Sequence, residues 1–123
     1  DGSFRMNCNE LCTLQHYNIP VIIVIMDNHA LGNVRQWQTM FYGKRYSETT
    51  LDRGPDFVKL AEAYGIDGYR AENKEQFDKA LKSALAKNLP AVIDAEIDMD
   101  EFILPMVAPG NSIKEMMSEK PKS

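Results

Sequence analysis

A short run of β-branched residues gives the clearest constraint on the fold of this chain. Val21 to Ile25 follows Pro20 and ends at the polar pair Asp27-Asn28. Residues of this type, bounded by turn-forming ones, predict a strand. We therefore predict a strand from Pro20 to Met26, with Asn28 just beyond its carboxyl end.

The chain begins with turn-forming residues, Asp1-Gly2-Ser3, and an amphipathic stretch follows them. We predict one helix from Ser3 to about Tyr17, because its apolar residues follow the spacing of one buried stripe: Phe4, Cys8, Leu11 and Cys12. Such a helix climbs roughly 21 Å at ~1.5 Å per residue, and the next strand returns about as far. Asp1 and Asn28 should therefore lie at neighbouring strand ends. The free N–H groups of the helix face the same point, where its dipole favours an anion such as a diphosphate.

Helices and strands alternate along the rest of the chain. We predict two more strands, Gly68 to Ala71 and Ala91 to Ile97, and three more helices, about 31–42, from Pro55 to Gly65, and 73–88. This order indicates an α/β fold, a parallel sheet with helices on both faces. Asp1 should already end a strand, so we expect residues 1–123 to be the carboxyl-terminal part of a larger domain, truncated at its N-terminal side. Residues 111–123 are expected to form a flexible tail.

Composition narrows the classes of function. The net charge is −4 and the basic residues are not clustered, which argues against nucleic-acid binding. No apolar run approaches the ~20 residues that would cross a membrane. We therefore expect a cytoplasmic protein without nucleic-acid or membrane partners.

Two groups of side chains could bind a metal ion. Asp1 and Asn28 supply the oxygen ligands that Mg²⁺ prefers, although both residue types also serve as plain turn and cap formers. Cys8, Cys12 and His16 share a helical spacing but lack a fourth ligand, and we expect both cysteines to be buried, reduced thiols. Asp27 and His29 flank Asn28 and are expected to be loop residues.

Several motifs resemble one family. Asp1-Gly2-Ser3, with Asn28 further along, is similar to the thiamine diphosphate motif, which reads Gly-Asp-Gly, an intervening stretch and Asn. The remaining motifs resemble the large catalytic subunit of acetolactate synthase, and the resemblance covers nearly the whole chain. They are Leu31-Gly32-Asn33-Val34-Arg35-Gln36-Trp37-Gln38, Arg45-Tyr46-Ser47 and Leu104-Pro105-Met106-Val107.

The resemblance implies thiamine diphosphate and Mg²⁺ as cofactors, with FAD in the full-length parent. It implies that Asp1, Asn28 and the carbonyl of Ala30 bind Mg²⁺, and that these residues with Gly2, Ser3 and Gly32 hold the cofactor. Trp37 would shape the pocket for the second substrate, or else be a core aromatic residue. Asn33 would lie close to the thiazolium ring, where the family usually has Met.

The resemblance also implies a reaction. The parent enzyme would decarboxylate pyruvate and condense the two-carbon unit with a second 2-keto acid, such as 2-ketobutyrate, in branched-chain amino acid biosynthesis. It would be a homodimer or tetramer, and whether a regulatory small subunit binds stays open. The activating glutamate belongs to another domain, so residues 1–123 hold no catalytic residue, and we expect this part to be inactive alone.

Other interpretations stay open from the sequence. A pyruvate oxidase or glyoxylate carboligase would share the Asp1 and Asn28 site but should lack the string from Arg35 to Gln38. A receiver-like or flavodoxin-like module would need an acidic cluster with a lysine, or a flavin loop, and neither is found. The chain could also serve only as an assembly surface.

Overall fold

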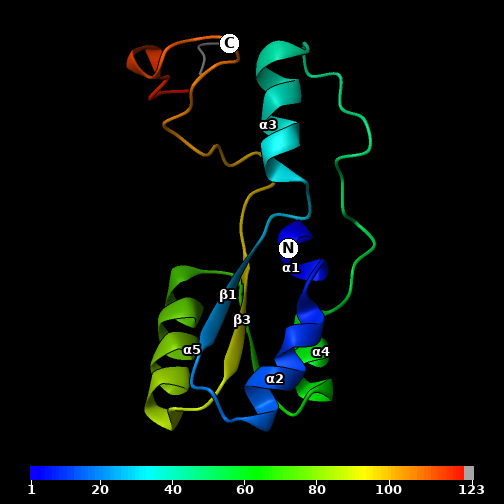
Figure 1. Cartoon of the computed structure of the whole chain (residues 1–123), viewed down its shortest axis with the longest axis vertical. Coiled ribbons are helices and arrows are strands. Elements are labelled where there is room, and N and C mark those ends of the chain that lie inside the picture. Colours follow the sequence, from blue (N-terminus) through cyan, green and yellow to red (C-terminus); the bar gives the residue numbers. More distant parts are fainter. Residues whose placement is uncertain (121–123) are drawn as a thin grey trace.

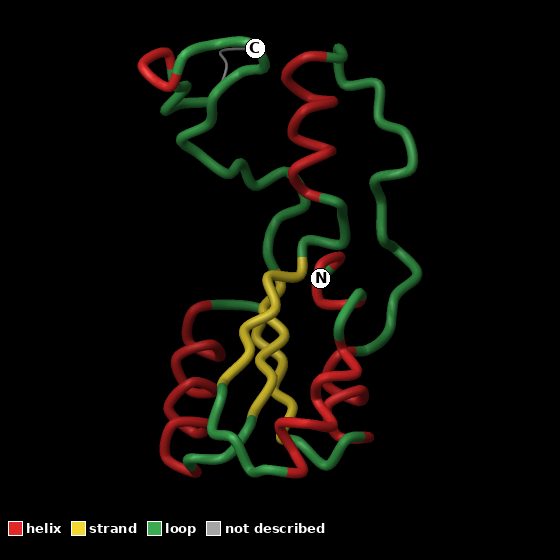
Figure 2. Tube along the Cα trace, in the orientation of Figure 1, coloured by secondary structure: helices red, strands yellow, loops and turns green. Residues whose placement is uncertain are grey.

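A three-stranded parallel sheet forms the centre of the molecule, in a computed structural model that describes residues 1–120. The strands are β1 (Ile22–Asp27), β2 (Asp67–Ala71) and β3 (Ala91–Glu96), in the order β1-β3-β2. The sheet occupies the lower half of the molecule in Figures 1 and 2. The predicted α/β class and parallel sheet are confirmed.

β3 is the central strand and the most deeply buried one. Both of its neighbours are parallel to it, and Ile22 of β1 and Asp67 of β2 share the register partner Ala91. Residues 91–95 of β3 are all buried, because strands cover both edges and helices cover both faces. The carboxyl ends of all three strands therefore point to the same end of the sheet.

Helices lie on both faces of the sheet, as predicted (Figure 1). α5 (Lys74–Lys87) covers one face, and α2 (Leu11–His16) and α4 (Phe57–Ala63) cover the other. Consecutive residues of a strand point to opposite faces, so Val92 and Ile93 enter different hydrophobic clusters. The first cluster contains Leu11, Ile25, Phe57, Ala61, Ile66 and Val92, and the second contains Ala71, Ala80 and Ile93.

The ends of α4 and α5 follow from their capping residues. Asn73 accepts a hydrogen bond from the N–H of Gln76 at 3.0 Å, which confirms the predicted start of α5. Asn88 ends α5 in the left-handed region at φ 49°, and Gly65 follows α4 at φ 74°. The start of α4 differs from the prediction. Asp56, and not Pro55, forms the boundary, since its carboxylate caps the first turn.

The predicted single helix from Ser3 to Tyr17 is wrong. The segment forms α1 (Gly2–Arg5), the 3₁₀ turn η1 (Cys8–Glu10) and then α2. Asn7 lies outside the helical region at φ −136° and ψ 24°, in keeping with the weak helix preference of asparagine. The predicted stripe is broken as a result. Leu11 is buried, but Cys8 is only half-buried and Cys12 is exposed, so the predicted burial of both thiols is also wrong.

α3 (Gly32–Phe41) stands beyond the carboxyl end of the sheet, close to the predicted range 31–42 (Figure 1). The C-terminal arm, residues 97–120, runs back beside it. Gln36 joins the two, because its side-chain amide donates to the carbonyl of Ile103 at 3.1 Å and accepts from the N–H of Ile103 at 2.8 Å. Arg35 adds an ion pair with Asp100 at 2.6 Å. The arm is therefore attached to α3.

The segment predicted to be a flexible tail contains local structure. Ser112 caps the 3₁₀ turn η2 (Ile113–Glu115) with a capping box, and Met106 and Met117 form an antiparallel bridge. Residues 121–123 lie outside the described residues, and the flexibility of 111–123 stays a prediction. No helix in the described range 1–120 has both the length and the apolar content to cross a membrane.

Candidate functional site

A cavity of about 460 Å³ lies where the N-terminal residues, the end of β1 and the start of α3 meet. We call it the β1-end cavity. All six residues that the sequence proposed as cofactor ligands line it: Asp1, Gly2, Ser3, Asn28, Ala30 and Gly32. The backbone nitrogen of Asp1 donates to the carbonyl of Met26 at 3.1 Å, which places Asp1 beside β1. Residues far apart in sequence thus share one cavity.

The carboxylate of Asp1 is buried and only half satisfied. Its side chain is 1% exposed, and its Oδ2 faces Nη2 of Arg5 at 3.4 Å. The other oxygen, Oδ1, is buried and has no hydrogen-bond partner among residues 1–120. A buried, unpartnered carboxylate oxygen is costly in free energy, and a cation would remove that cost. The residues present therefore fit a metal ion at this position.

Asn28 lines the same cavity as Asp1 and forms a tight local structure there. Its Oδ1 accepts a hydrogen bond from the N–H of Ala30 at 3.2 Å. A Cβ atom placed on Gly32 would lie 2.7 Å from Nδ2 of Asn28, closer than such contacts come in proteins. Glycine at position 32 therefore leaves room for the Asn28 amide.

Ala30 is almost fully buried, with 3% exposure, and is held by an antiparallel bridge to Thr50. The bridge uses the carbonyl of His29 and the N–H of Leu31, at 2.7 and 2.8 Å. It leaves the carbonyl of Ala30 outside the hydrogen-bond pair. This carbonyl is a third oxygen that could serve a cation in the β1-end cavity.

Two helices begin at the β1-end cavity. α1 is a single turn, so the predicted dipole of a long first helix is wrong. α3 has ten residues and starts at Gly32, which lines the cavity, and the first N–H groups of a helix have no acceptor within it. The helix over 31–42 and the role of Gly32 in cofactor binding were predicted, but the start of this helix was not predicted to attract an anion, although Gly32 follows Asn28 closely. The start of α3 therefore favours an anion in the cavity.

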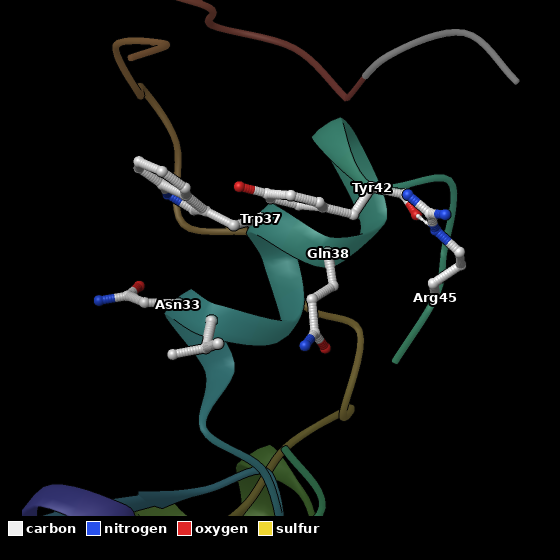
Figure 3. A pocket seen from close by; sticks show the side chains of 6 residues that line it. Asn33, Trp37, Gln38, Tyr42 and Arg45 are labelled. Atoms are coloured by element: carbon white, nitrogen blue, oxygen red, sulfur yellow. Dashed lines mark hydrogen bonds between the residues drawn. The ribbon is translucent and has the colours of Figure 1, made fainter. Parts of the chain in front are cut away.

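A second cavity of about 600 Å³ lies along α3 (Figure 3). We call it the Trp37 cavity, and its lining is Asn33, Val34, Trp37, Gln38, Tyr42 and Arg45. Asn33 and Trp37 project from the same side of α3 in Figure 3. Trp37 is 39% exposed and packs edge-on against Phe41, with ring centroids 5.6 Å apart, so it is not a core residue. Asn33 and Val34 line both cavities, which are therefore adjacent.

The residues of the string Arg35-Gln36-Trp37-Gln38 have different structural roles. Arg35 and Gln36 hold the C-terminal arm, as described above. Gln38 holds the loop after α3, since its amide donates to the carbonyl of Ser47 at 3.1 Å and accepts from the hydroxyl of Thr49 at 3.3 Å. Trp37 and Gln38 are the two residues of the string that line the Trp37 cavity.

The thiol cluster considered from the sequence does not form. Within the described residues, the side chains whose ligand atoms gather within 4.8 Å of one another do not include Cys8, Cys12 and His16. The break between α1 and α2 removes the helical spacing on which that interpretation rested.

Comparison with known proteins decides the family. The model of the family described as thiamine pyrophosphate enzyme, C-terminal TPP binding domain, matches residues 1–95. The chain belongs to this family. The resemblance read from the sequence motifs is thereby confirmed.

The chain is also similar to individual members of the family. It is 46% identical over 117 residues to the probable acetolactate synthase large subunit of Methanocaldococcus jannaschii, covering 95% of this chain and 20% of that protein. It is 45% identical over 119 residues to the acetolactate synthase isozyme 2 large subunit of Escherichia coli, covering 97% of this chain and 22% of that protein. The chain thus spans about a fifth of the length of these relatives.

A solved structure supports the fold. The thiamine diphosphate-dependent 4-hydroxybenzoylformate decarboxylase of Rhodococcus jostii superposes with a TM-score of 0.74 at 34% sequence identity. The match covers 83% of this chain and 19% of that one. The three-stranded sheet is therefore part of a larger fold in that enzyme.

Proposed function

We propose that the β1-end cavity binds the diphosphate of thiamine diphosphate together with Mg²⁺, and that this chain is the diphosphate-binding part of an acetolactate synthase large subunit. The observation that carries the proposal is the buried, unpartnered Oδ1 of Asp1, a residue that lines the same cavity as Asn28. The similarity to acetolactate synthase large subunits supports it.

The oxygen atoms around the cavity suit Mg²⁺. A carboxylate, an amide oxygen and a backbone carbonyl are the ligands such a cation takes beside phosphate and water, and Asp1, Asn28 and Ala30 would supply them. The N–H groups of Gly2 and Ser3, with those at the start of α3, would donate to the diphosphate. A Cβ on Gly2 would lie 3.0 Å from Leu31, so glycine allows the close approach of these two segments.

The Trp37 cavity is our proposed site for the second keto acid. When bound, thiamine diphosphate would supply the carbon nucleophile for decarboxylation of pyruvate and for carbon–carbon bond formation. Trp37 would orient the acceptor, pyruvate or 2-ketobutyrate, against an apolar wall. Asn33 lines both cavities and would set the polarity between them.

The remaining properties of the parent enzyme are proposals that rest on the resemblance to acetolactate synthase. We infer that the parent enzyme binds FAD and acts in branched-chain amino acid biosynthesis in the cytoplasm. It would form a homodimer or tetramer, and a regulatory small subunit is a further candidate partner. Its activating glutamate would come from another domain. This chain alone would then bind cofactor without turning over substrate.

Calorimetric titration of the protein with thiamine diphosphate, in the presence of Mg²⁺, tests the cofactor site. Asp1→Ala and Asn28→Ala should each weaken Mg²⁺-dependent binding at least tenfold, whereas Asp78→Ala, on the exposed side of α5, should leave it unchanged. The same three variants in the full-length parent should give the same order for acetolactate formation. Equal affinities for all three would contradict the proposal.

A decarboxylase of aromatic keto acids is the second candidate function. The structural match to the 4-hydroxybenzoylformate decarboxylase favours it. Product analysis with the parent enzyme separates the two: pyruvate gives acetolactate by carbon–carbon bond formation, while a simple decarboxylase releases an aldehyde from pyruvate or benzoylformate. The same analysis would reveal the pyruvate oxidase and glyoxylate carboligase alternatives.

A further inference from the structure

Three potential metal ligands meet beside the β1-end cavity, outside the residues assigned to it. Asp27 ends β1, Glu96 ends β3, and the two are register partners. His29 lies two residues beyond Asp27. One ligand atom from each of the three side chains lies within 4.8 Å of the others. Asp27 is 5% exposed and belongs to the strand, which corrects the expectation that it is a loop residue.

The imidazole of His29 lies between two carboxylates. Its Nδ1 is 3.4 Å from Oδ1 of Asp27, and its Nε2 is 2.8 Å from Oε2 of Glu96. Ligands at ~2.0 Å from a tetrahedral Zn²⁺ are roughly 3.3 Å apart, so the first distance already matches one edge of such a site. One ion takes one ring nitrogen, so coordination of Glu96 to an ion at Nδ1 would require its side chain, which is 30% exposed, to turn away from Nε2.

A separate observation also points to a cation here. Asp94 is 1% exposed, and its Oδ1 has no hydrogen-bond partner in the part of the chain that is described. It lines a cavity of about 160 Å³ together with Asp27, His29 and Glu96. Burial first, and then the negative charge of Asp27, raise the pKa of Asp94 above its ordinary value. A buried carboxylate with one unpartnered oxygen thus lines the same cavity as the cluster.

The two arginines that line this cavity make their contacts through Nη2, while Nε of Arg5 is buried without a hydrogen-bond partner among the described residues. Nη2 of Arg70 contacts Oδ2 of Asp94 at 3.2 Å and Asp56 at 3.1 Å. Nη2 of Arg5 contacts Asp1 at 3.4 Å and the carbonyl of Leu51 at 3.3 Å. None of these contacts reaches Oδ1 of Asp94. Among the described residues, the carboxylates of Asp27 and Glu96 form ion pairs with His29 alone, and Oδ1 of Asp27 also accepts from the backbone N–H of His29 at 3.1 Å.

We propose that Asp27, His29 and Glu96 bind one Zn²⁺ ion in the cavity that Asp94 also lines. One imidazole nitrogen with carboxylate oxygens is a donor set that Zn²⁺ accepts, while Mg²⁺ prefers oxygen alone. The site is therefore distinct from the proposed Mg²⁺ site, with which it shares no residue. By joining the ends of β1 and β3, the ion would hold the turn that carries Asn28 and Ala30.

Calorimetric titration of the chelator-treated protein with Zn²⁺ tests this site. We expect one ion per chain, retained in a large excess of Mg²⁺. The chain has two histidines, so His16→Ala is a matched control for His29→Ala. Zn²⁺ affinity should fall at least tenfold in His29→Ala and in Glu96→Gln, and should be unchanged in His16→Ala and in the double variant Cys8→Ser with Cys12→Ser.

Thermal unfolding gives a second readout that does not depend on catalysis. Zn²⁺ should raise the Tm of the protein and of His16→Ala, because a ligand that binds the folded state stabilises it, but not that of His29→Ala. Glu96→Gln is nearly isosteric at a partly exposed position, so it decides the matter if His29→Ala fails to fold. Absence of stoichiometric Zn²⁺ binding by the protein would overturn the proposal, as would full affinity in Glu96→Gln or loss of affinity in the cysteine double variant.

Discussion

Gly32 packs so closely against the side chain of Asn28 that a Cβ at position 32 would lie 2.7 Å from Nδ2 of Asn28. The first residue of α3 thus determines where the Asn28 amide can lie. The amide in turn holds the N–H of Ala30, whose carbonyl is a candidate Mg²⁺ ligand. One missing methyl group therefore influences two of the proposed metal ligands.

Substituting Gly32 by Ala should disturb this arrangement without unfolding the protein, since alanine favours a helix. We expect the affinity for thiamine diphosphate and Mg²⁺ to fall about tenfold, a loss of roughly 1.4 kcal/mol. Calorimetry measures it, with Lys82→Ala on α5 as a remote control. Unchanged affinity in Gly32→Ala would show that the Asn28 amide does not have to stay in place.

Replacing Trp37 by Leu should change selectivity more than cofactor affinity. The variant removes an aromatic wall of the Trp37 cavity, and loss of apolar contact worth ~1–3 kcal/mol changes discrimination about 10- to 200-fold. In the parent enzyme, competition between pyruvate and 2-ketobutyrate should show a lower share of acetohydroxybutyrate. Tyr17→Leu replaces an aromatic residue that is 69% exposed and should change nothing. An equal product ratio in both variants would contradict a role for Trp37 in acceptor choice.

Truncating Gln36 to Ala should loosen the C-terminal arm. Both backbone groups of Ile103 would lose their side-chain partner, at a cost of about 1–2 kcal/mol. Amide hydrogen exchange at Ile103 and its neighbours should accelerate roughly 5- to 30-fold. Exchange in β3 should stay as it is. Gln15→Ala, on the exposed side of α2, serves as the control, and equal exchange in the two variants would mean that other contacts hold the arm.

Asp56 should stabilise the protein in a pH-dependent way. Its Oδ1 accepts from the N–H groups of Val58 and Lys59, at 3.1 and 3.2 Å, and contacts Arg70. The Lys59 N–H first, and then the Arg70 charge, hold the pKa of Asp56 below its ordinary value against partial desolvation. The stabilisation is therefore present above about pH 4 and is lost as the pH falls through the lowered pKa.

Urea unfolding measures this effect. Asp56→Ala should cost ~1–2 kcal/mol of unfolding free energy at pH 7, and the difference from the unsubstituted protein should shrink near pH 3. Asp56→Asn keeps a capping oxygen without the charge and should cost less at pH 7. A cost for Asp56→Ala that does not change with pH would assign the effect to packing instead.

The strands and the caps of α5 could be predicted because their causes are local. β-branched residues between turns define β1, and Asn73 with Gln76 defines the start of α5. Asp1 and Asn28 could be brought together from sequence because a helix and a strand of similar length return the chain to one end of the sheet. In the structure both residues line one cavity, although the predicted helix is broken into α1, η1 and α2.

The features that could not be predicted from the sequence depend on contacts between residues that are distant along the chain. Asn7 interrupts the first helix, although its weak helix preference alone did not decide that outcome. The task of Gln36 could not be foreseen, because its partner Ile103 lies 67 positions away. The meeting of Asp27 with Glu96 needed the strand order β1-β3-β2, which no local pattern contains.

α3 stands outside the sheet, and none of the residues around the Trp37 cavity belongs to either hydrophobic cluster. Substitutions around this cavity can therefore accumulate during evolution at little cost to folding. The neighbouring glycines and Asp1 have no such freedom. A scaffold of this kind can diverge in what it accepts while it keeps the means of holding its coenzyme.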